Sequence, residues 1–140
     1  MMGKAPAKAR TAEELLGPEF AGRHVELIKG EIVEVTPAHS KHAYVVGRLL
    51  KILITAISQL PANERILVTS GESGFFVTQD PDSVLAPDVA IVDQGKLEEA
   101  SKKIQFAPFA PAVAIEVLSP SNTRAEMLQK MEEEAHYMQK

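Results

Sequence analysis

Two acidic stretches, Pro87-Asp88-Val89 and Ile115-Glu116-Val117-Leu118-Ser119-Pro120-Ser121, decide how this chain is expected to fold. Each places one carboxylate on or at the end of an apolar, β-branched run, and turn residues bound both runs. We therefore predict two short strands, residues 86–92 and 111–118, that each carry one acidic residue. A carboxylate in such an apolar strand is costly unless it is paired, protonated or bound to a cation.

Two interpretations of these carboxylates are open. If the strands are neighbours, Asp88 and Glu116 together form an oxygen-rich site suited to Mg²⁺ or Mn²⁺. Alternatively, Asp88 caps a turn and Glu116 pairs with a lysine or arginine. Taken alone, the two stretches favour the second, structural interpretation.

Composition narrows the class of protein. The 140 residues are 45% hydrophobic, which suits one globular domain, here placed at residues 11–140 behind a basic, disordered leader at residues 1–10. The absence of cysteine excludes disulfides and thiolate sites. The net charge of −4 gives no overall basic face for nucleic acid, but it does not exclude a local basic patch. The leader lacks the apolar core of a secretory signal. The longest apolar run, 45–60, is broken by Arg48 and Lys51, so we expect no membrane span and a cytoplasmic protein.

The rest of the chain supplies further candidate residues. Thr11 and Glu14 form a capping-box pattern, and residues 24–35 read as a hairpin turning at Lys29-Gly30. Its glutamates are ordinarily surface residues, and this interpretation fits Glu34 best. The other glutamates of the hairpin are Glu26 and Glu31.

A helix is predicted over residues 41–60, with Ser40 as its N-cap. His42 lies on its apolar stripe, which favours a core or helix-start role over a functional one. That stripe continues through Val46, Leu49, Leu50, Leu53, Ile57 and Leu60, at three- and four-residue steps.

Strand 65–70 is predicted to form a hairpin with 73–78, and the polar stretch 93–103 is expected to hold a short helix. Ser-Pro-Ser-Asn at 119–122 is expected to cap a last helix, from Thr123 to about Lys140, with apolar positions at Met127, Leu128, Met131, Ala135 and Met138. Lys130 stands beside that apolar stripe. Its ammonium either reaches water or, if the helix packs over the acidic strand, lies between the carboxylates.

The order of these motifs resembles the Uma-type family of putative restriction endonucleases, within the PD-(D/E)xK nuclease superfamily. The resemblance runs from about His24 to Glu133 and rests on five motifs in a fixed order. They are the hairpin Val-Glu-Leu-Ile-Lys-Gly-Glu-Ile-Val-Glu, a histidine at the next helix start, Gly-Glu-Ser-Gly-Phe, Ala-Pro-Asp-Val-Ala-Ile-Val and Ile-Glu-Val-Leu-Ser-Pro-Ser, followed by Lys130.

The resemblance implies an α/β (α+β) restriction-endonuclease-like fold, with a mixed central β-sheet flanked by helices. It assigns Asp88 and Glu116 to the two acidic positions of the nuclease motif. Leu118 stands where a lysine is expected, and Lys130 matches the substitute on the following helix. Glu26 and His42 match further polar positions near the site.

By the same resemblance, Asp88, Glu116 and the Val117 carbonyl would ligate Mg²⁺ or Mn²⁺, and the protein would be a Mg²⁺-dependent endonuclease that cuts DNA. Lys130 would orient the attacking water or stabilise developing charge.

The resemblance weakens after Glu133, because the family pattern continues with a Tyr one turn after the lysine and then a Gly and a Trp-containing strand, and residues 134–140 do not match it. The family's last strand or strands are therefore expected to be missing, which leaves a shortened member, a truncated product or a homodimer that completes its sheet. Two further functions stay open beside the endonuclease: a catalytically degenerate relative that binds nucleic acid or protein, and an oligomeric module whose acidic pair is structural.

Overall fold

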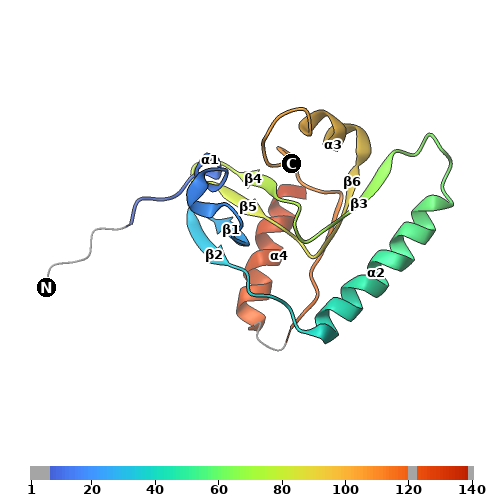
Figure 1. Ribbon diagram of the computed structural model, residues 1–140, viewed down its shortest axis with the longest axis horizontal. Helices are drawn as coiled ribbons and strands as arrows, with labels where there is room; N and C mark the ends of the chain where they lie inside the picture. The colour runs from blue at the N-terminus through green and yellow to red at the C-terminus, as the bar shows by residue number, and fades with distance from the viewer. Residues whose placement is uncertain (1–6, 120–122, 139–140) are drawn as a thin grey trace, which may run out of the picture.

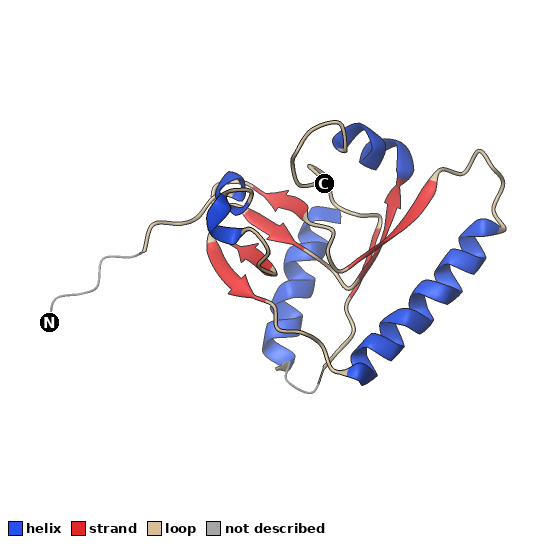
Figure 2. Cartoon of the chain, viewed as in Figure 1, coloured by secondary structure: helices blue, strands red, loops and turns tan. Residues whose placement is uncertain are grey.

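The computed structural model describes residues 7–119 and 123–138, which form an α+β domain (Figures 1 and 2). This confirms the expected fold class. The elements, in chain order, are α1 (Ala12–Leu15), η1 (Pro18–Phe20), β1 (Val25–Ile28), β2 (Glu31–Glu34), α2 (Ser40–Ser58), β3 (Ile66–Ser70), β4 (Phe75–Thr78), β5 (Ser83–Leu85), β6 (Val89–Asp93), α3 (Gln94–Ala100), β7 (Val113–Ile115) and α4 (Arg124–Met138).

The strands form two antiparallel sheets. Sheet A has the order β2-β1-β5-β4, and sheet B has the order β3-β6-β7. Helix α2 packs against β3 and β6 of sheet B, whereas α4 contacts β4 of sheet A. Figure 1 shows α2 at one side of the molecule and α4 near its middle, with the first turns of both helices at the same edge.

The hairpin predicted at Lys29-Gly30 is confirmed. Its turn has positive φ at both central residues, 48° at Lys29 and 79° at Gly30, which matches the twist of the flanking strands. Gly30 is also needed for space, since a Cβ there would lie 2.6 Å from the Cβ of Ala9. The turn thereby holds the incoming chain, and the Arg10 amide donates to the Gly30 carbonyl at 2.8 Å.

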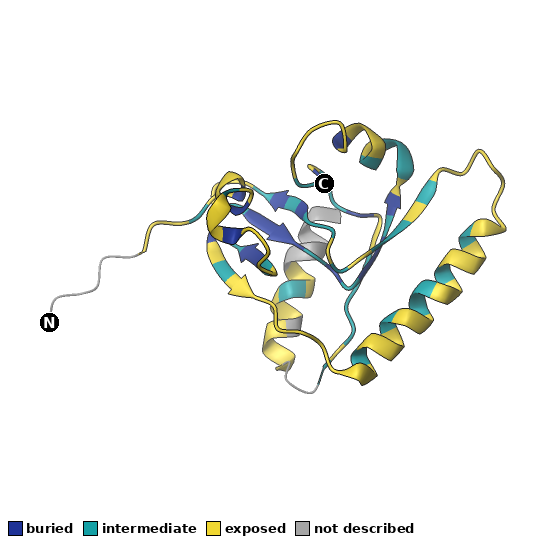
Figure 3. Ribbon diagram, viewed as in Figure 1, coloured by how far each residue is buried: buried dark blue, intermediate teal, exposed yellow. Residues whose placement is uncertain are grey.

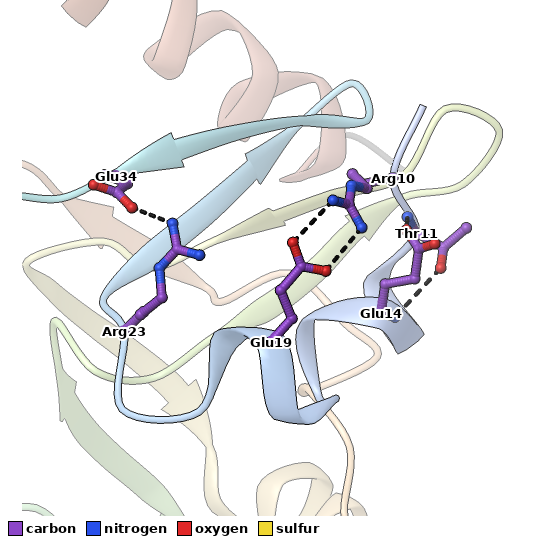
Figure 4. A network of polar contacts seen from close by, with 6 residues as sticks. All are labelled: Arg10, Thr11, Glu14, Glu19, Arg23 and Glu34. Atoms are coloured by element: carbon purple, nitrogen blue, oxygen red, sulfur yellow. Dashed lines mark hydrogen bonds and ion pairs between the residues drawn. The ribbon is translucent and has the colours of Figure 1, made fainter. Parts of the chain in front are cut away.

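The N-terminal segment is held by short-range polar contacts, drawn in Figure 4. The capping box of Thr11 and Glu14 is confirmed. Arg10 pairs with Glu19 at 2.9 Å, and its guanidinium lies 5.7 Å from the ring centre of Phe20. Residues 1–6 of the predicted leader lie outside the described residues, whereas Arg10 already contacts the domain.

Strand β3 does not pair with the segment that follows it, so the predicted hairpin of 65–70 with 73–78 is wrong. β3 forms a five-pair antiparallel ladder with β6, and β4 pairs with β5 in the other sheet. The turn residues at 71–74 reverse the chain in either arrangement. The central strand β6 contributes Val89, Ala90 and Val92, which are at most 1% exposed, and Ala90 and Val92 belong to the same core cluster as Phe75 of β4.

Helix α2 begins at Ser40, and the N-cap position belongs to His39, so the predicted Ser40 cap is displaced by one residue. His39 has the extended backbone of a cap but makes no side-chain cap hydrogen bond. The predicted stripe is confirmed from His42 to Ile57 as half-buried, although Leu60 is exposed. No helix in the described part of the chain is long and apolar enough to cross a membrane.

Helix α4 begins at Arg124, and its cap lies at Thr123. The Glu126 amide donates to Thr123 Oγ1 at 3.2 Å, and the Thr123 amide donates to Glu126 Oε2 at 3.0 Å. The capping was assigned to residues 119–122, of which 120–122 lie outside the described residues. Strand β7 is shorter than predicted, ending at Ile115. Of the predicted apolar stripe, Leu128 and Met131 are exposed.

The core consists of two aliphatic and aromatic clusters that lie on either side of β5. Phe75 is 1% exposed and packs edge-to-face on Phe109 with ring centres 6.1 Å apart. Leu27, fully buried in β1, joins the second cluster through Val84. The first cluster comprises Phe75, Val77, Leu85, Ala90, Val92 and Ala107, and the second comprises Ala12, Leu15, Leu27 and Val84. The first cluster packs β4 and β5 of sheet A against β6, and the second packs α1 against β1 and β5.

Candidate functional site

The β6–β7 ladder places the two predicted carboxylates side by side. Val89 pairs with Ile115 at the end of this antiparallel ladder. Asp88 immediately precedes β6 and Glu116 immediately follows β7, so the same register sets them opposite each other. Residues that are directly opposite in an antiparallel pair share one face. The structure therefore brings together the two acidic residues that lie 28 positions apart in the sequence.

Asp88 is held by two groups on one of its oxygens. The Val117 amide donates to Asp88 Oδ2 at 2.7 Å, and His42 Nε2 lies 3.2 Å from the same oxygen. The side chain of His42 is 14% exposed and that of Asp88 is 24% exposed. The first turn of α2 is thus fastened to the start of β6.

Glu116 and Glu26 share one cation. The Lys130 ammonium lies 2.7 Å from Glu116 Oε1 and 3.0 Å from Glu26 Oε1. The side chains of Glu26, Glu116 and Lys130 are only 6%, 10% and 18% exposed. The Ala86 amide also donates to Glu26 Oε1, at 2.8 Å. Helix α4 therefore joins sheet A to sheet B through a single, largely buried ammonium.

These contacts close into a ring. Glu26 holds Ala86, two residues before Asp88, and Asp88 holds Val117, one residue after Glu116. The ring runs through Glu26, Ala86, Asp88, Val117, Glu116 and Lys130, and His42 contacts it from outside. Each member fixes the backbone or side chain of the next, so the site is positioned by long-range contacts instead of one loop.

The site carries more negative than positive charge. Among the described side chains of the site, three carboxylates face one ammonium, which gives these four groups a net charge of −2 when His42 is counted as neutral. Burial of Lys130 disfavours the charged ammonium, but attraction to Glu26 and then to Glu116 outweighs it. The pKa of Lys130 is therefore raised above its ordinary value of 10.5, and the ammonium stays protonated at neutral pH.

The chemistry of the donor groups fits a hard divalent cation. Carboxylate oxygens are what Mg²⁺ and Mn²⁺ prefer, and the excess of two negative charges matches the charge of either ion. Within residues 7–119 and 123–138, no group of three or more His, Asp or Glu side chains is arranged to hold a metal. A bound ion would thus need ligands besides Asp88 and Glu116, such as the backbone carbonyl of Val117 or water.

The structure brings together all five side chains singled out in the sequence: Glu26, His42, Asp88, Glu116 and Lys130. For Val117 it provides the amide bonded to Asp88, and the ligand role of its carbonyl stays a prediction. Glu26 is buried, not a surface residue, because β1 lies between β2 and β5. Sequence reasoning missed the Ala86 amide, since a backbone donor leaves no side-chain signal.

Comparisons with known proteins agree with this fold. The model of the family described as "Uma2: Putative restriction endonuclease" matches residues 11–135. The crystal structure of a putative nuclease belonging to DUF820 from Anabaena variabilis is similar, with a TM-score of 0.65 and 14% identity. The similarity covers 81% of this chain and 60% of that one, so this chain spans less than two thirds of its length. No curated protein matches the chain. Since the family match covers most of the sequence, the chain belongs to the Uma2 family of putative restriction endonucleases.

Proposed function

We propose that the protein is a metal-dependent endonuclease that hydrolyses phosphodiester bonds of DNA. The observation that carries the proposal is that Asp88 and Glu116 directly adjoin the last pair of the β6–β7 ladder, Val89 and Ile115, with the Lys130 ammonium 2.7 Å from Glu116. A structural ion pair needs one carboxylate and one cation. The excess of carboxylates in a largely buried cluster instead suits a site that binds a further cation.

In this proposal, Asp88, Glu116 and the Val117 carbonyl hold Mg²⁺ or Mn²⁺. When bound, such an ion acidifies water and neutralises charge on phosphate oxygens. His42 and the Val117 amide fix the orientation of Asp88 by contacting one of its oxygens. The other carboxylate oxygen then faces no competing contact from these two groups.

Lys130 acts as a fixed cation in this proposal, not as a base. Its raised pKa keeps the ammonium protonated, so it has no lone pair with which to accept a proton. Its three N–H bonds can hold Glu116, Glu26 and a phosphate oxygen or water at the same time. Glu26 is a positioning residue that orients this ammonium through a 3.0 Å contact.

The experiment combines metal binding with DNA cleavage. Mg²⁺ and Mn²⁺ are titrated by calorimetry into the wild type, Asp88→Asn and Glu132→Gln, and the same samples are assayed for plasmid nicking. Asn keeps the acceptor for the Val117 amide but removes the charge. Glu132 is exposed on the helix that carries Lys130, so its variant is the matched control. We expect Asp88→Asn alone to lose both metal binding and nicking.

A second function is favoured by one observation. Lys130 already neutralises part of the charge on Glu26 and Glu116, and such an internal counterion also suits a non-catalytic relative that binds nucleic acid or a partner protein. Wild-type protein that binds neither metal would support this function and exclude the nuclease. Wild-type nicking that survives in Asp88→Asn would show that the active site lies elsewhere.

A further inference from the structure

Helix α2 and its flanking loops form one of two cationic stretches in a chain that is acidic overall, the other being residues 1–10. Residues 36–63 contain Lys41, Arg48 and Lys51 but no aspartate or glutamate. The whole chain carries −4, so this segment carries +3 and the remainder carries −7. Such a separation of charge creates a local positive potential that the net charge of the protein conceals.

The three cations lie on one face of α2. Lys41, Tyr44, Arg48 and Lys51 follow each other at three- and four-residue steps, which aligns them along the helix. All four are exposed, Tyr44 by 66%. The face opposite them is the half-buried stripe beginning at His42 that packs against sheet B. Figure 3 shows this division of α2 into half-buried and exposed positions.

This cationic face, defined as Lys41, Tyr44, Arg48 and Lys51, is available to a partner. None of its three cations forms an ion pair within the described part of the chain. Arg48 and Lys51 lie on the exposed surface of α2 beside Ile52, Thr55, Ala56 and Gln59. The helix therefore offers cations to solvent, with no carboxylate in its own segment, residues 36–63.

The cationic face begins next to the candidate site. Lys41 precedes His42, whose Nε2 lies 3.2 Å from Asp88. From Lys41 to Lys51 the helix rises about 15 Å, at about 1.5 Å per residue. Groups bound along this face would therefore extend away from the carboxylates past the first turn of α2.

We propose that the cationic face of α2, which points away from the half-buried side of the helix, binds the phosphate backbone of duplex DNA. Lys41, Arg48 and Lys51 supply the charge, and the Tyr44 hydroxyl can donate to a phosphate oxygen. The proposal rests on the proposed function for its choice of partner. A second copy of α2 is a poorer partner, because pairing the same face with itself would oppose like charges.

The experiment measures binding without cleavage. A labelled DNA duplex is titrated in EDTA by fluorescence anisotropy at several salt concentrations, with three proteins. These are the wild type, a variant carrying Lys41→Gln, Arg48→Gln and Lys51→Gln, and a control carrying Lys96→Gln, Lys102→Gln and Lys103→Gln. Both variants lose the same charge, so only the position of the cations differs.

We expect the slope of log affinity against log salt to be shallower by about 2.7 in the α2 variant, since each lost phosphate contact removes about 0.9. When the salt rises from about 50 to about 200 mM, these three contacts alone should weaken DNA binding by the wild type about 40-fold. The α2 variant lacks the three contacts, so its affinity should not show this part of the salt dependence. The control should match the wild type. Asp88→Asn should also bind, which separates this proposal from the catalytic one.

Each of the following results would overturn the proposal. The first is equal salt slopes for the α2 variant and its control, and the second is no duplex binding by the wild type. The third is tighter α2-dependent binding to vesicles of phosphatidylserine than to DNA, or α2-dependent dimerisation seen by light scattering. Duplex binding that needs α2 while the wild type fails to cleave would leave this inference standing and remove only the nuclease.

Discussion

The molecule contains two groups of charged side chains that differ in almost every physical respect. Near the N-terminus, Arg10 pairs with Glu19 and Arg23 pairs with Glu34, between residues at most 11 positions apart (Figure 4). Their side chains are 40–65% exposed. At the candidate site, Lys130 pairs with Glu26 across 104 positions, and its side chain is 18% exposed.

The N-terminal ion pairs hold a chain segment in place, whereas the charges around Lys130 form a candidate site. Exposed ion pairs contribute little to the free energy of unfolding, because water screens the two charges and both side chains lose conformational freedom. Buried charges are costly unless each has a partner, so a buried cluster with unequal numbers of opposite charges is a reason to look for function. The N-terminal group is balanced, whereas the site carries an excess of two negative charges.

The largest effect is expected from Lys130→Met. The variant leaves Glu26 and Glu116 buried without the shared ammonium, which should lower the free energy of unfolding by about 3–5 kcal/mol. Urea denaturation measures this change, and Lys102→Met, at an exposed lysine, is the control. Adding Glu26→Gln and Glu116→Gln should recover much of the loss. A change below about 1 kcal/mol would place the Lys130 pairs in the same class as the exposed ones.

The same ion pairs predict a loss of stability at alkaline pH. The folded pKa of Lys130 is raised, so its contribution is fully present below the unfolded pKa of about 10.4 and is lost as pH rises toward the folded value. Above about pH 10.4, the stability difference between wild type and Lys130→Met should shrink by about 1.4 kcal/mol per pH unit. Urea denaturation of both proteins across this range tests it. A difference that stays constant with pH would contradict the ion pairs.

An intermediate effect is expected from His42→Ala. It removes the 3.2 Å contact to Asp88 Oδ2 but leaves the Val117 amide in place, so the cost should be about 1–2 kcal/mol. Thermal denaturation is compared with plasmid nicking, with His39→Ala as the control on the same segment. If His42→Ala loses stability but nicks plasmid normally, His42 has a purely structural role. Lost nicking at an unchanged Tm would make it a residue of the site.

The smallest effect is expected from Arg10→Ala. It removes an exposed ion pair and one cation–π contact with Phe20, together worth about 1 kcal/mol or less. The loss should diminish further as salt rises, because exposed charges are screened. Thermal denaturation at low and high salt measures it. A larger loss that is insensitive to salt would mean that this group is as tightly coupled as the site.

Much of the local structure could be predicted from the sequence. The capping box of Thr11 and Glu14, the Lys29-Gly30 hairpin and the α2 stripe depend on residues within a few positions of one another, so their signals survive without tertiary contacts. The pairing of β3 with 73–78 was predicted by the same local reasoning and was wrong. Turn residues show where a chain reverses, but which strand it then meets depends on what the whole sheet must bury.

By itself, the sequence determined which chemical groups the protein holds: two acidic strand ends, a hairpin glutamate, a helix-start histidine and one lysine on the last helix. The tertiary structure decided their relations. The β6–β7 register set Asp88 opposite Glu116, the place of β1 inside sheet A buried Glu26, and the packing of α4 brought Lys130 between two carboxylates. Such contacts join residues tens of positions apart, and their geometry exists only once the sheets and helices pack together.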